Sequence, residues 1–378
     1  MGEWRRHLHR HPETEFSVHE TAAYIASLLR EWGLEVHEGI GQTGLVAVLR
    51  KGSGDKQKMI ALRADMDAMP IEEKNCFEYR SQNEGRMHAC GHDGHCAMLL
   101  GAARYLAMHG QFNGTIFFVF QPNEEHGLGA RAMIDDGLFE KFPASACYSL
   151  HNLPGLEAGH IALRAGAIMA SESLFEIAIA GKGGHASSPH LCIDPVVVAS
   201  HIIPGLQTIA SRTVDPLDSI VVSVTEIHTD GARNVIPSNV TIKGDCRTFS
   251  DANTDLVQKR LTEIAHAAAA MFGAHCEVTF SREFIVSVNS ETETAAAAKA
   301  ALAVNGPDRV DAECQPRSFS EDFAHMQQVV PGCYIFIGNG SDSVGGCMLH
   351  NPHYDFNDSI LATGAEYWIT LVEQQLES

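Results

Sequence analysis

The sequence is poor in basic residues, has no long apolar run and lacks any C-x-x-C pair. Lysine and arginine number 27 against 47 aspartates and glutamates, which gives a net charge of −20. A negative field repels phosphate backbones, so we expect no nucleic-acid partner. Apolar runs such as 116–120 are far shorter than the roughly 20 residues of a membrane-spanning helix, so we expect no membrane partner.

Signal peptides and disulfides are not indicated either. The first residues, from Met1 to His7, are polar and lack the apolar core of a signal peptide, which favours a cytoplasmic protein. The ten cysteines are scattered, so most are expected to be buried thiols or metal ligands. Histidine is abundant, with 21 residues, and several stand in clusters beside acids and a cysteine. This clustering indicates metal chemistry.

The length of 378 residues and an apolar content of 45% predict two globular domains rather than one. In the first part of the chain, short apolar runs without alternation are typical of strands that are covered on both faces. Helical stretches lie between them, which predicts an α/β fold with a mixed, mostly parallel sheet. The runs are 45–49, 59–62, 115–120 and 146–150.

The pattern changes at about residue 170. From there the chain reads strand–helix–strand–strand–helix–strand, which is the order of a small α+β sandwich, and the α/β pattern resumes after about residue 282. We therefore predict a discontinuous catalytic domain, residues 1–169 and 282–378, with an α+β domain of residues 170–281 inserted in it.

Two helix starts carry capping signals. Ser17 and Glu20 fit a capping box for a helix that ends near Gly33. Asp194 is suited to cap a helix whose first residue is Pro195.

Two clusters combine residue types that bind metals. Cys90 and His92 stand two residues apart before a helix, where both can reach one ion or two adjacent ions. The alternative is a structural cysteine beside surface histidines. Glu124 and Glu125 follow the apolar strand 115–120, and adjacent carboxylates allow one to bind metal while the other accepts a proton. The alternative there is a solvated pair of acids in a loop.

Two further histidines lie in comparable places. His151 follows an apolar strand, and His350 precedes the last helix in a loop rich in acids and amides. Read alone, the first could be a satisfied core residue, and the second could belong to a solvated loop in which Asp358 caps the helix. Strand ends and helix starts mark the edge where α/β sheets bind ligands. Together the clusters offer up to five ligands, which suits a two-metal hydrolytic centre better than a closed structural zinc site.

Motifs in the same order along nearly the whole chain make it resemble a known family. It is similar to the aminoacylase, hippurate hydrolase and auxin-conjugate amidohydrolase group of dinuclear metallopeptidases. The motifs are RHLHRHPE (6–13), RADMDAMP (63–70), MHACGHD (87–93), QPNEE (121–125), GKGGHA (181–186), NVIP (234–237), SEDF (320–323) and HNPHYDFND (350–358).

The resemblance implies a role for each cluster. It implies two divalent ions, each of which could be Mn, Zn, Co or Ni. Glu124 would be the general base that takes a proton from metal-bound water and delivers it to the leaving amine. Asp67 would be an acid that orients a ligand. The implied metal ligands are Cys90, His92, Glu125, His151 and His350.

The inserted domain corresponds to the lid or dimerisation domain of that family, which implies a homodimer. His185 would help to hold the oxyanion across the dimer, unless it is a turn residue in a glycine-rich loop. Asn234 and Arg247 resemble the pair that binds the free carboxylate of the substrate, although Arg247 could instead form a surface ion pair.

The expected activity is hydrolysis of N-acyl-amino acids, such as N-acetyl or N-benzoyl conjugates, to a carboxylic acid and a free amino acid. The alternatives are a dipeptidase or an N-acyl-diamino-acid deacetylase of the same superfamily, a hydrolase with Cys90 as nucleophile, and a non-catalytic scaffold. One departure concerns substrate size. His126 and Leu128 stand where the family has small residues, and their bulk could narrow the acyl pocket.

Overall fold

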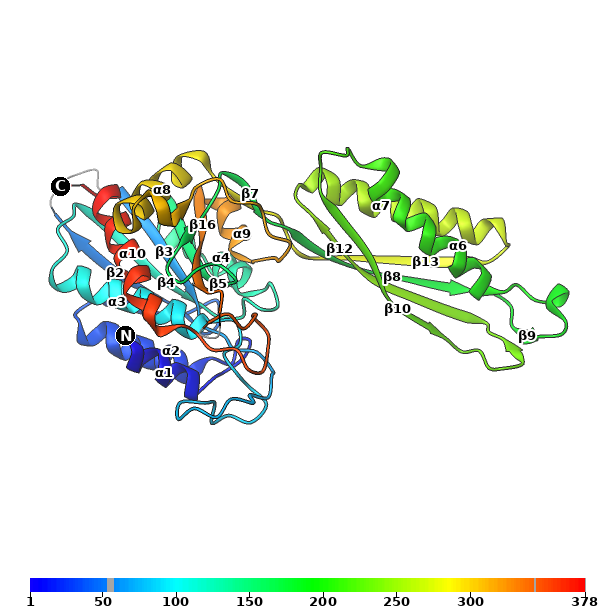
Figure 1. The fold of residues 1–378 in the computed structure, drawn as a ribbon, viewed down its shortest axis with the longest axis horizontal. Helices are drawn as coiled ribbons and strands as arrows, with labels where there is room; N and C mark the ends of the chain where they lie inside the picture. Colours follow the sequence, from blue (N-terminus) through cyan, green and yellow to red (C-terminus); the bar gives the residue numbers. More distant parts are fainter. Residues whose placement is uncertain (53–57, 343–344, 378) are drawn as a thin grey trace. The chain divides into compact units, whose positions relative to one another are not determined.

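The computed structural model describes residues 1–52, 58–342 and 345–377, and they form two compact units (Figure 1). The first unit comprises Met1–Ile168, Ser287–Pro316 and Glu321–Ser378. The second comprises Met169–Val286 and Arg317–Ser320, so the chain leaves the first unit and later returns to it. Across the described residues, no helix has both the length and the apolar character that a membrane span requires.

The first unit is built on a sheet of eight strands in the order β1-β2-β4-β3-β5-β16-β6-β15. Its four central strands, β4, β3, β5 and β16, are mutually parallel, whereas β1 and β2 pair in antiparallel fashion at one edge. The mixed, mostly parallel sheet predicted from the sequence is therefore confirmed. The strands are β1 (Glu35–Ile40), β2 (Gly44–Lys51), β3 (Lys58–Asp65), β4 (Gly114–Gln121), β5 (Ala146–Pro154), β6 (Ile161–Ala162), β15 (Val310–Asp311) and β16 (Gly332–Gly340).

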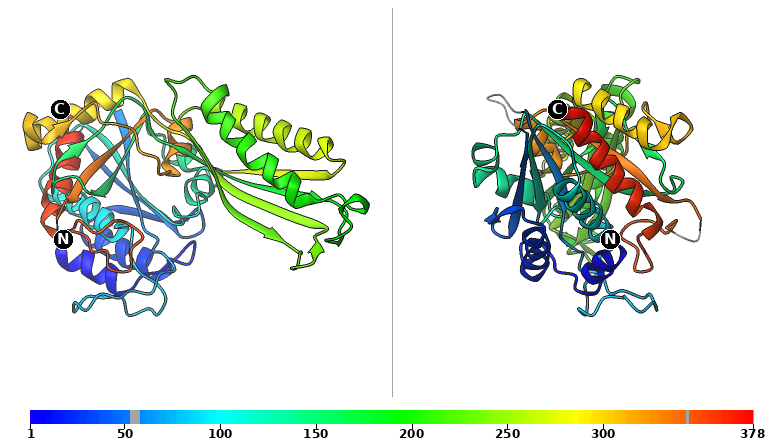
Figure 2. Two further views of the ribbon diagram at one scale, coloured as in Figure 1. Left: turned by 45° about the vertical axis from the view of Figure 1, so that its right-hand side comes forward. Right: turned by 90° about the vertical axis from the view of Figure 1, so that its left-hand side faces the viewer.

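Helices cover this sheet, and strands β4 and β16 are buried along their whole length (Figure 2). Burial on both faces explains why their apolar runs do not alternate. One hydrophobic core joins helices α2, α3, α8 and α10 to the sheet, with Trp368 fully buried in it. The helices of the first unit are α1 (Gly2–Arg10), α2 (His19–Glu31), α3 (His92–Met108), α4 (Gly129–Asp135), α5 (Leu138–Lys141), α8 (Glu291–Asn305), α9 (Phe323–Val329) and α10 (Leu361–Gln375).

The two capping predictions have different outcomes. Asp194 caps α6 (Pro195–Thr208) as expected, and its carboxylate accepts a hydrogen bond from the Val196 backbone N–H. The capping box at Ser17 is wrong, because α2 begins one residue later and has no side-chain cap on its own N-cap residue. A carboxylate from outside the helix takes that place, since Glu13 accepts from the Thr21 backbone N–H at 2.8 Å.

The second unit is an α+β layer structure. Its antiparallel sheet has the order β10-β12-β8-β13, and burial alternates along β8 and β12 because only one face is covered. Helices α6 and α7 pack on that face and close a separate hydrophobic core. A short ribbon of β9 and β11 lies beyond the end where Ala180 pairs with Asn239. The elements are β8 (Ser171–Ala180), β9 (Gly184–His185), β10 (Ile220–Thr229), β11 (Val235–Ile236), β12 (Asn239–Thr248), α7 (Asp251–Met271) and β13 (His275–Phe284).

Candidate metal centre

The five predicted ligands come from four segments of the first unit. His151 stands in β5, and Glu125 follows β4, so the two strands that flank β3 in the parallel sheet supply one ligand each. Cys90 precedes α3, and His92 is the first residue of that helix. His350 lies in the segment between β16 and α10. The fold thus places all five in one unit, although 260 positions separate the first from the last in the sequence.

A glycine allows Cys90 and His92 to face the same space. Gly91, between them, has a left-handed backbone with φ of 95°. A Cβ at this position would lie 2.2 Å from the Asn152 side-chain oxygen and 2.6 Å from the Tyr354 hydroxyl. Both the conformation and the space therefore require glycine at this turn.

The side-chain donors lie at distances that suit shared metal ions. Cys90 Sγ is 3.3 Å from His151 Nε2, and Glu125 Oε2 is 3.5 Å from His350 Nε2. Two ligands of one ion at a tetrahedral angle are separated by about 3.3–3.8 Å. Three donor groups have atoms within 4.8 Å of one another, and because Cys90, His92 and Glu125 each belong to two of them, the cluster fits a pair of ions. The groups are Cys90–His92–His151, Cys90–Glu125–His350 and His92–Glu124–Glu125.

Two buried atoms of this cluster have no hydrogen-bond partner among the described residues. They are His92 Nε2 and Glu125 Oε1, which lie 3.9 Å apart. Buried polar atoms almost always have a partner, so these atoms need one of another kind. A divalent cation would satisfy both.

The histidine tautomers also suit metal binding. His92 Nδ1 donates to the Asp67 backbone carbonyl at 2.8 Å, and His151 Nδ1 donates to the Asn152 carbonyl at 2.7 Å. A carbonyl can only accept, so each Nδ1 carries a hydrogen, and in the neutral form of each ring the lone pair lies on Nε2. Both Nε2 atoms belong to the donor cluster.

The electrostatics of the cluster indicate a missing positive charge. Burial and the nearby Glu125 and Glu124 carboxylates raise the pKa of the Cys90 thiol well above its usual range. Burial also raises the pKa of Glu125 to about 7. Acids are not normally gathered in a buried space without cations, and a metal would favour the ionised form of each ligand.

Glu124 is buried beside the ligands and belongs to a cluster with two other acids. Its carboxylate lies within 4.8 Å of those of Glu321 and Asp322. Burial and these neighbours raise the pKa of Glu124 well above its usual range. Asp67 fixes the turn, since its two carboxylate oxygens accept from the backbone N–H groups of Glu124 and Glu125 at 3.0 and 3.2 Å. Because Asp67 holds the turn through the backbone, the Glu124 side chain is not needed for that purpose. It lies beside His92 and Glu125.

The sequence predicted no function for several residues of this region. Asp65 and His95 are fully buried with His92, and Asp65 Oδ1 is 2.6 Å from His95 Nδ1. The fully buried Arg63 contacts Asp65, Glu321 and Asp322 at 2.7–3.1 Å. His95 follows His92 by three residues on the same helix face, a spacing that could have identified it. The acids belong to motifs 63–70 and 320–323, but nothing in those motifs shows that they meet.

The residues that depart from the family do not fill the core. Leu128 is 47% exposed, and His126 Nδ1 lies 3.1 Å from the Asn123 side-chain oxygen. Both stand beside Gly127, whose φ is 67°.

The other three predicted site residues lie in the second unit. His185 and Asn234 share the β9–β11 region, where the Ala186 N–H donates to the Asn234 carbonyl at 3.0 Å. Arg247 lies at the opposite end of β12, where it is paired with Glu172 and Asp245 and donates to Ser320 Oγ. The eight steps from Asn239 to Arg247 span roughly 26 Å of strand. One chain therefore keeps Asn234 and Arg247 apart, and their joint role in carboxylate binding stays a prediction.

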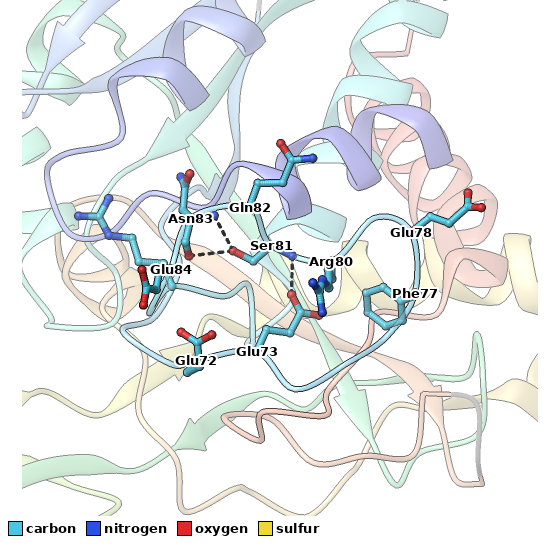
Figure 3. A pocket seen from close by; sticks show the side chains of 10 residues that line it. Glu72, Glu73, Phe77, Glu78, Arg80, Ser81, Gln82, Asn83 and Glu84 are labelled. Atoms are coloured by element: carbon cyan, nitrogen blue, oxygen red, sulfur yellow. Dashed lines mark hydrogen bonds between the residues drawn. The ribbon is translucent and has the colours of Figure 1, made fainter.

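A separate polar cavity of about 600 Å³ lies along the loop of residues 72–86 (Figure 3). Glu73 lines this cavity and accepts from the Ser81 backbone N–H. It also lies 3.2 Å from His9 Nε2, and the other ring nitrogen of His9 lies 2.9 Å from Asp93 Oδ2. Burial alone would lower the pKa of His9, but these two carboxylates raise it to about 9.

We expect the pKa of His9 to make stability depend on pH. A histidine whose pKa rises from about 6.5 unfolded to about 9 folded contributes stability below pH 6.5 that is lost as pH rises through 9, here about 3 kcal/mol. Urea unfolding of the metal-stripped protein at pH 6.5 and pH 9.5 measures this loss. His9→Gln should lose less stability over the same interval, and equal losses in both proteins would contradict the assignment.

Comparison with known proteins identifies relatives along almost the whole chain. Peptidase family M20/M25/M40 matches residues 61–374. Hippurate hydrolase of Campylobacter jejuni subsp. jejuni serotype O:2 is 39% identical over 373 residues, which cover 99% of this chain and 96% of that protein. N-acetylcysteine deacetylase of Bacillus subtilis is 37% identical over 378 residues, which cover 99% of this chain and 96% of that protein.

A solved structure agrees in fold. The YXEP protein of Bacillus subtilis, described as a dinuclear metal binding peptidase from the M20 family, is 33% identical, with a TM-score of 0.85 over 99% of this chain and 97% of that one. The resemblance that the motifs indicated is thus confirmed. From the order of its motifs, its fold and its relatives, the chain is a member of peptidase family M20/M25/M40.

Proposed function

We propose that this protein is a metal-dependent amidohydrolase that cleaves N-acyl-amino acids into a carboxylic acid and a free amino acid. The observation that carries the proposal is the buried Glu124 carboxylate beside two donor groups that share Cys90, namely Cys90–His92–His151 and Cys90–Glu125–His350. The names of the relatives support the substrate class, since hippurate and N-acetylcysteine are both N-acyl-amino acids.

Five residues would hold two divalent ions. His151 would bind one ion and His350 the other, because these two belong to different donor groups, and Cys90 is common to both groups. One thiolate with imidazole and carboxylate ligands suits Zn, Mn, Co or Ni. Bound there, the ions polarise the scissile carbonyl and lower the pKa of water.

Glu124 would carry the proton. Its carboxylate is buried and adjoins the donor cluster, and its turn is held through the backbone by Asp67, so the side chain is free to accept a proton from water and pass it to the leaving amine. Its neighbours Glu321 and Asp322 make its carboxylate more basic, which favours proton uptake. Arg63 holds both neighbours in place.

The second unit would complete the site as a lid and dimerisation domain. His185 Nδ1 accepts from the Ser187 backbone N–H, so the neutral ring has its hydrogen on Nε2, where it can donate to an oxyanion. Because Asn234 and Arg247 are far apart within one chain, a homodimer in which one copy supplies His185 and Asn234 and the other Arg247 would reconcile their roles. The edge strand β10 exposes Val221 and Ile227 and is suited to pair with a second copy.

Seven of the ten cysteines are buried, and they are scattered along the chain, which is typical of thiols in a protein without a disulfide framework. This supports a reducing compartment, and we propose a cytoplasmic location.

A substrate panel tests the proposal. Metal-stripped protein, reloaded with Mn or Zn, is expected to release free amino acid from at least one N-acetyl- or N-benzoyl-amino acid. Analogues of these substrates in which an amide replaces the free carboxylate should react at least about tenfold more slowly, because a lost charge-assisted hydrogen bond costs roughly 1.5–3 kcal/mol. Dipeptides and N-acetyl-diamino acids in the same panel test the two related activities. Metal binding without release of any amine would make the protein a scaffold.

A further inference from the structure

Helix α1 inserts two basic side chains into the interior of the first unit. Arg5 and His9 are both 0% exposed. A buried cation is costly unless it is paired with an anion and hydrogen-bonded. The carboxylates that pair with these two side chains all come from other parts of the chain, so α1 joins segments that are distant in sequence.

Arg5 binds two acids in the segment that leads from His350 to α10. Its Nε donates to Asp358 Oδ1 at 2.7 Å, and its Nη1 donates to Asp355 Oδ1 at 3.1 Å. The ring of Tyr79 lies 4.6 Å from the guanidinium, and its hydroxyl donates to the other Asp355 oxygen at 2.7 Å. The segment is therefore held at two positions by one side chain.

The same two residues of α1 also reach the start of α3. Arg5 Nη1 lies 3.7 Å from Asp93 Oδ2, and His9 Nδ1 lies 2.9 Å from the same oxygen. Asp93 directly follows the proposed ligand His92. Arg5 thus connects the segment of one proposed ligand, His350, to the helix turn that carries another.

His350 needs such support more than the other ligands do. Its φ is 63°, a left-handed conformation that costs a residue other than glycine of the order of 1–3 kcal/mol. Its side chain is 52% exposed, so packing does not fix the imidazole. A backbone hydrogen bond from its N–H to the Ala89 carbonyl at 2.8 Å ties it to the Cys90 turn. The residues that follow it supply further constraint, among them Asp355 and Asp358.

We infer that Arg5 is a positioning residue of the metal centre. It holds His350 in its strained conformation by fixing Asp355 and Asp358 against Asp93. The inference rests on the proposed metal centre. It does not depend on which substrate the enzyme hydrolyses, because its action is on a ligand. Lysine cannot replace arginine in this role, since a single ammonium lacks the rigid fork that reaches several carboxylates at once.

The test is metal affinity without substrate. Metal-stripped protein is titrated with Co²⁺, whose thiolate and d–d absorption bands report binding and coordination. Arg5→Lys is expected to raise the dissociation constant about 10–100-fold, the usual effect of losing a residue that orients a ligand. The matched control is Leu371→Ala, a fully buried core residue of α10, which should lower thermal stability but leave Co²⁺ affinity within about twofold of wild type.

A double-mutant cycle identifies His350 as the ligand through which Arg5 acts. In an His350→Ala background, Arg5→Lys should change the dissociation constant by less than about twofold, because the ligand it positions is already absent. An equal loss in both backgrounds, or wild-type affinity in Arg5→Lys, would overturn the inference. If Arg5→Lys does not fold, Asp355→Asn replaces it in the same cycle. A wild-type protein that binds Co²⁺ but hydrolyses no N-acyl-amino acid would refute the proposed function alone.

Discussion

Glu124→Gln is expected to reduce kcat about 10²–10⁴-fold while the protein keeps its full metal content, since a positioned general base contributes a factor of this size. The glutamine has nearly the same shape, and the backbone N–H of residue 124 can still donate to Asp67. It cannot accept a proton from water. Steady-state kinetics on an N-acyl-amino acid, with metal analysis of the same sample, measure both quantities.

Two variants serve as controls for this prediction. Glu72→Gln changes the exposed residue of the chain's other adjacent glutamate pair, Glu72–Glu73, and should keep wild-type turnover. Glu125→Gln should lose metal as well as activity, because Glu125 belongs to the donor group of His350 and to one of those of His92. Turnover that survives in Glu124→Gln would show that another group moves the proton.

Removal of the metal is the second large effect that we expect. Dialysis against a chelator should lower turnover at least about a hundredfold, since metal polarisation of the carbonyl supplies several kcal/mol and each 1.4 kcal/mol is about tenfold in rate. Adding back Mn²⁺ or Zn²⁺ should restore it. The absorption of the Co²⁺-loaded protein should include a thiolate band that Cys90→Ala abolishes, because Cys90 is shared by two donor groups.

Dialysis against a chelator also tests whether the protein is a thiol hydrolase instead. A Cys90 nucleophile would keep its activity in chelator and would be inactivated by alkylation of the stripped enzyme. The structure disfavours that chemistry, because burial and two glutamates raise the pKa of the Cys90 thiol and leave little thiolate in the absence of a cation. Full activity in the chelated protein would refute the metal mechanism.

The sequence was informative wherever local pattern reflects local physics. Buried parallel strands must be apolar on both faces, so β4 and β5 could be read as continuous runs. The cap at Asp194 is a contact between residues two apart, and it is found as predicted. The cap predicted at Ser17 was wrong because the first turn of the helix is capped from outside. The carboxylate of Glu13, in a preceding turn, accepts a hydrogen bond from the Thr21 backbone N–H.

The roles of the charged residues depended on distant contacts. Nothing near Arg63 in the sequence indicates that it contacts Glu321, 258 positions away. The motif 6–13 contains His9, but Arg5 lies just before it, and the Asp358 that pairs with Arg5 lies 353 positions away. A buried ion pair has no sequence period, so it cannot be read from spacing.

The class of the fold, the places of several buried strands along the chain and the residue types able to bind metal were thus determined by the sequence alone, because hydrophobic periodicity and ligand chemistry are properties of short segments. Which carboxylates gather around Glu124, how α1 reaches the His350 segment and how far apart Asn234 and Arg247 lie were decided by tertiary structure. Burial of charge is stable only where the fold brings opposite charges and hydrogen-bond donors together, and that depends on the whole chain.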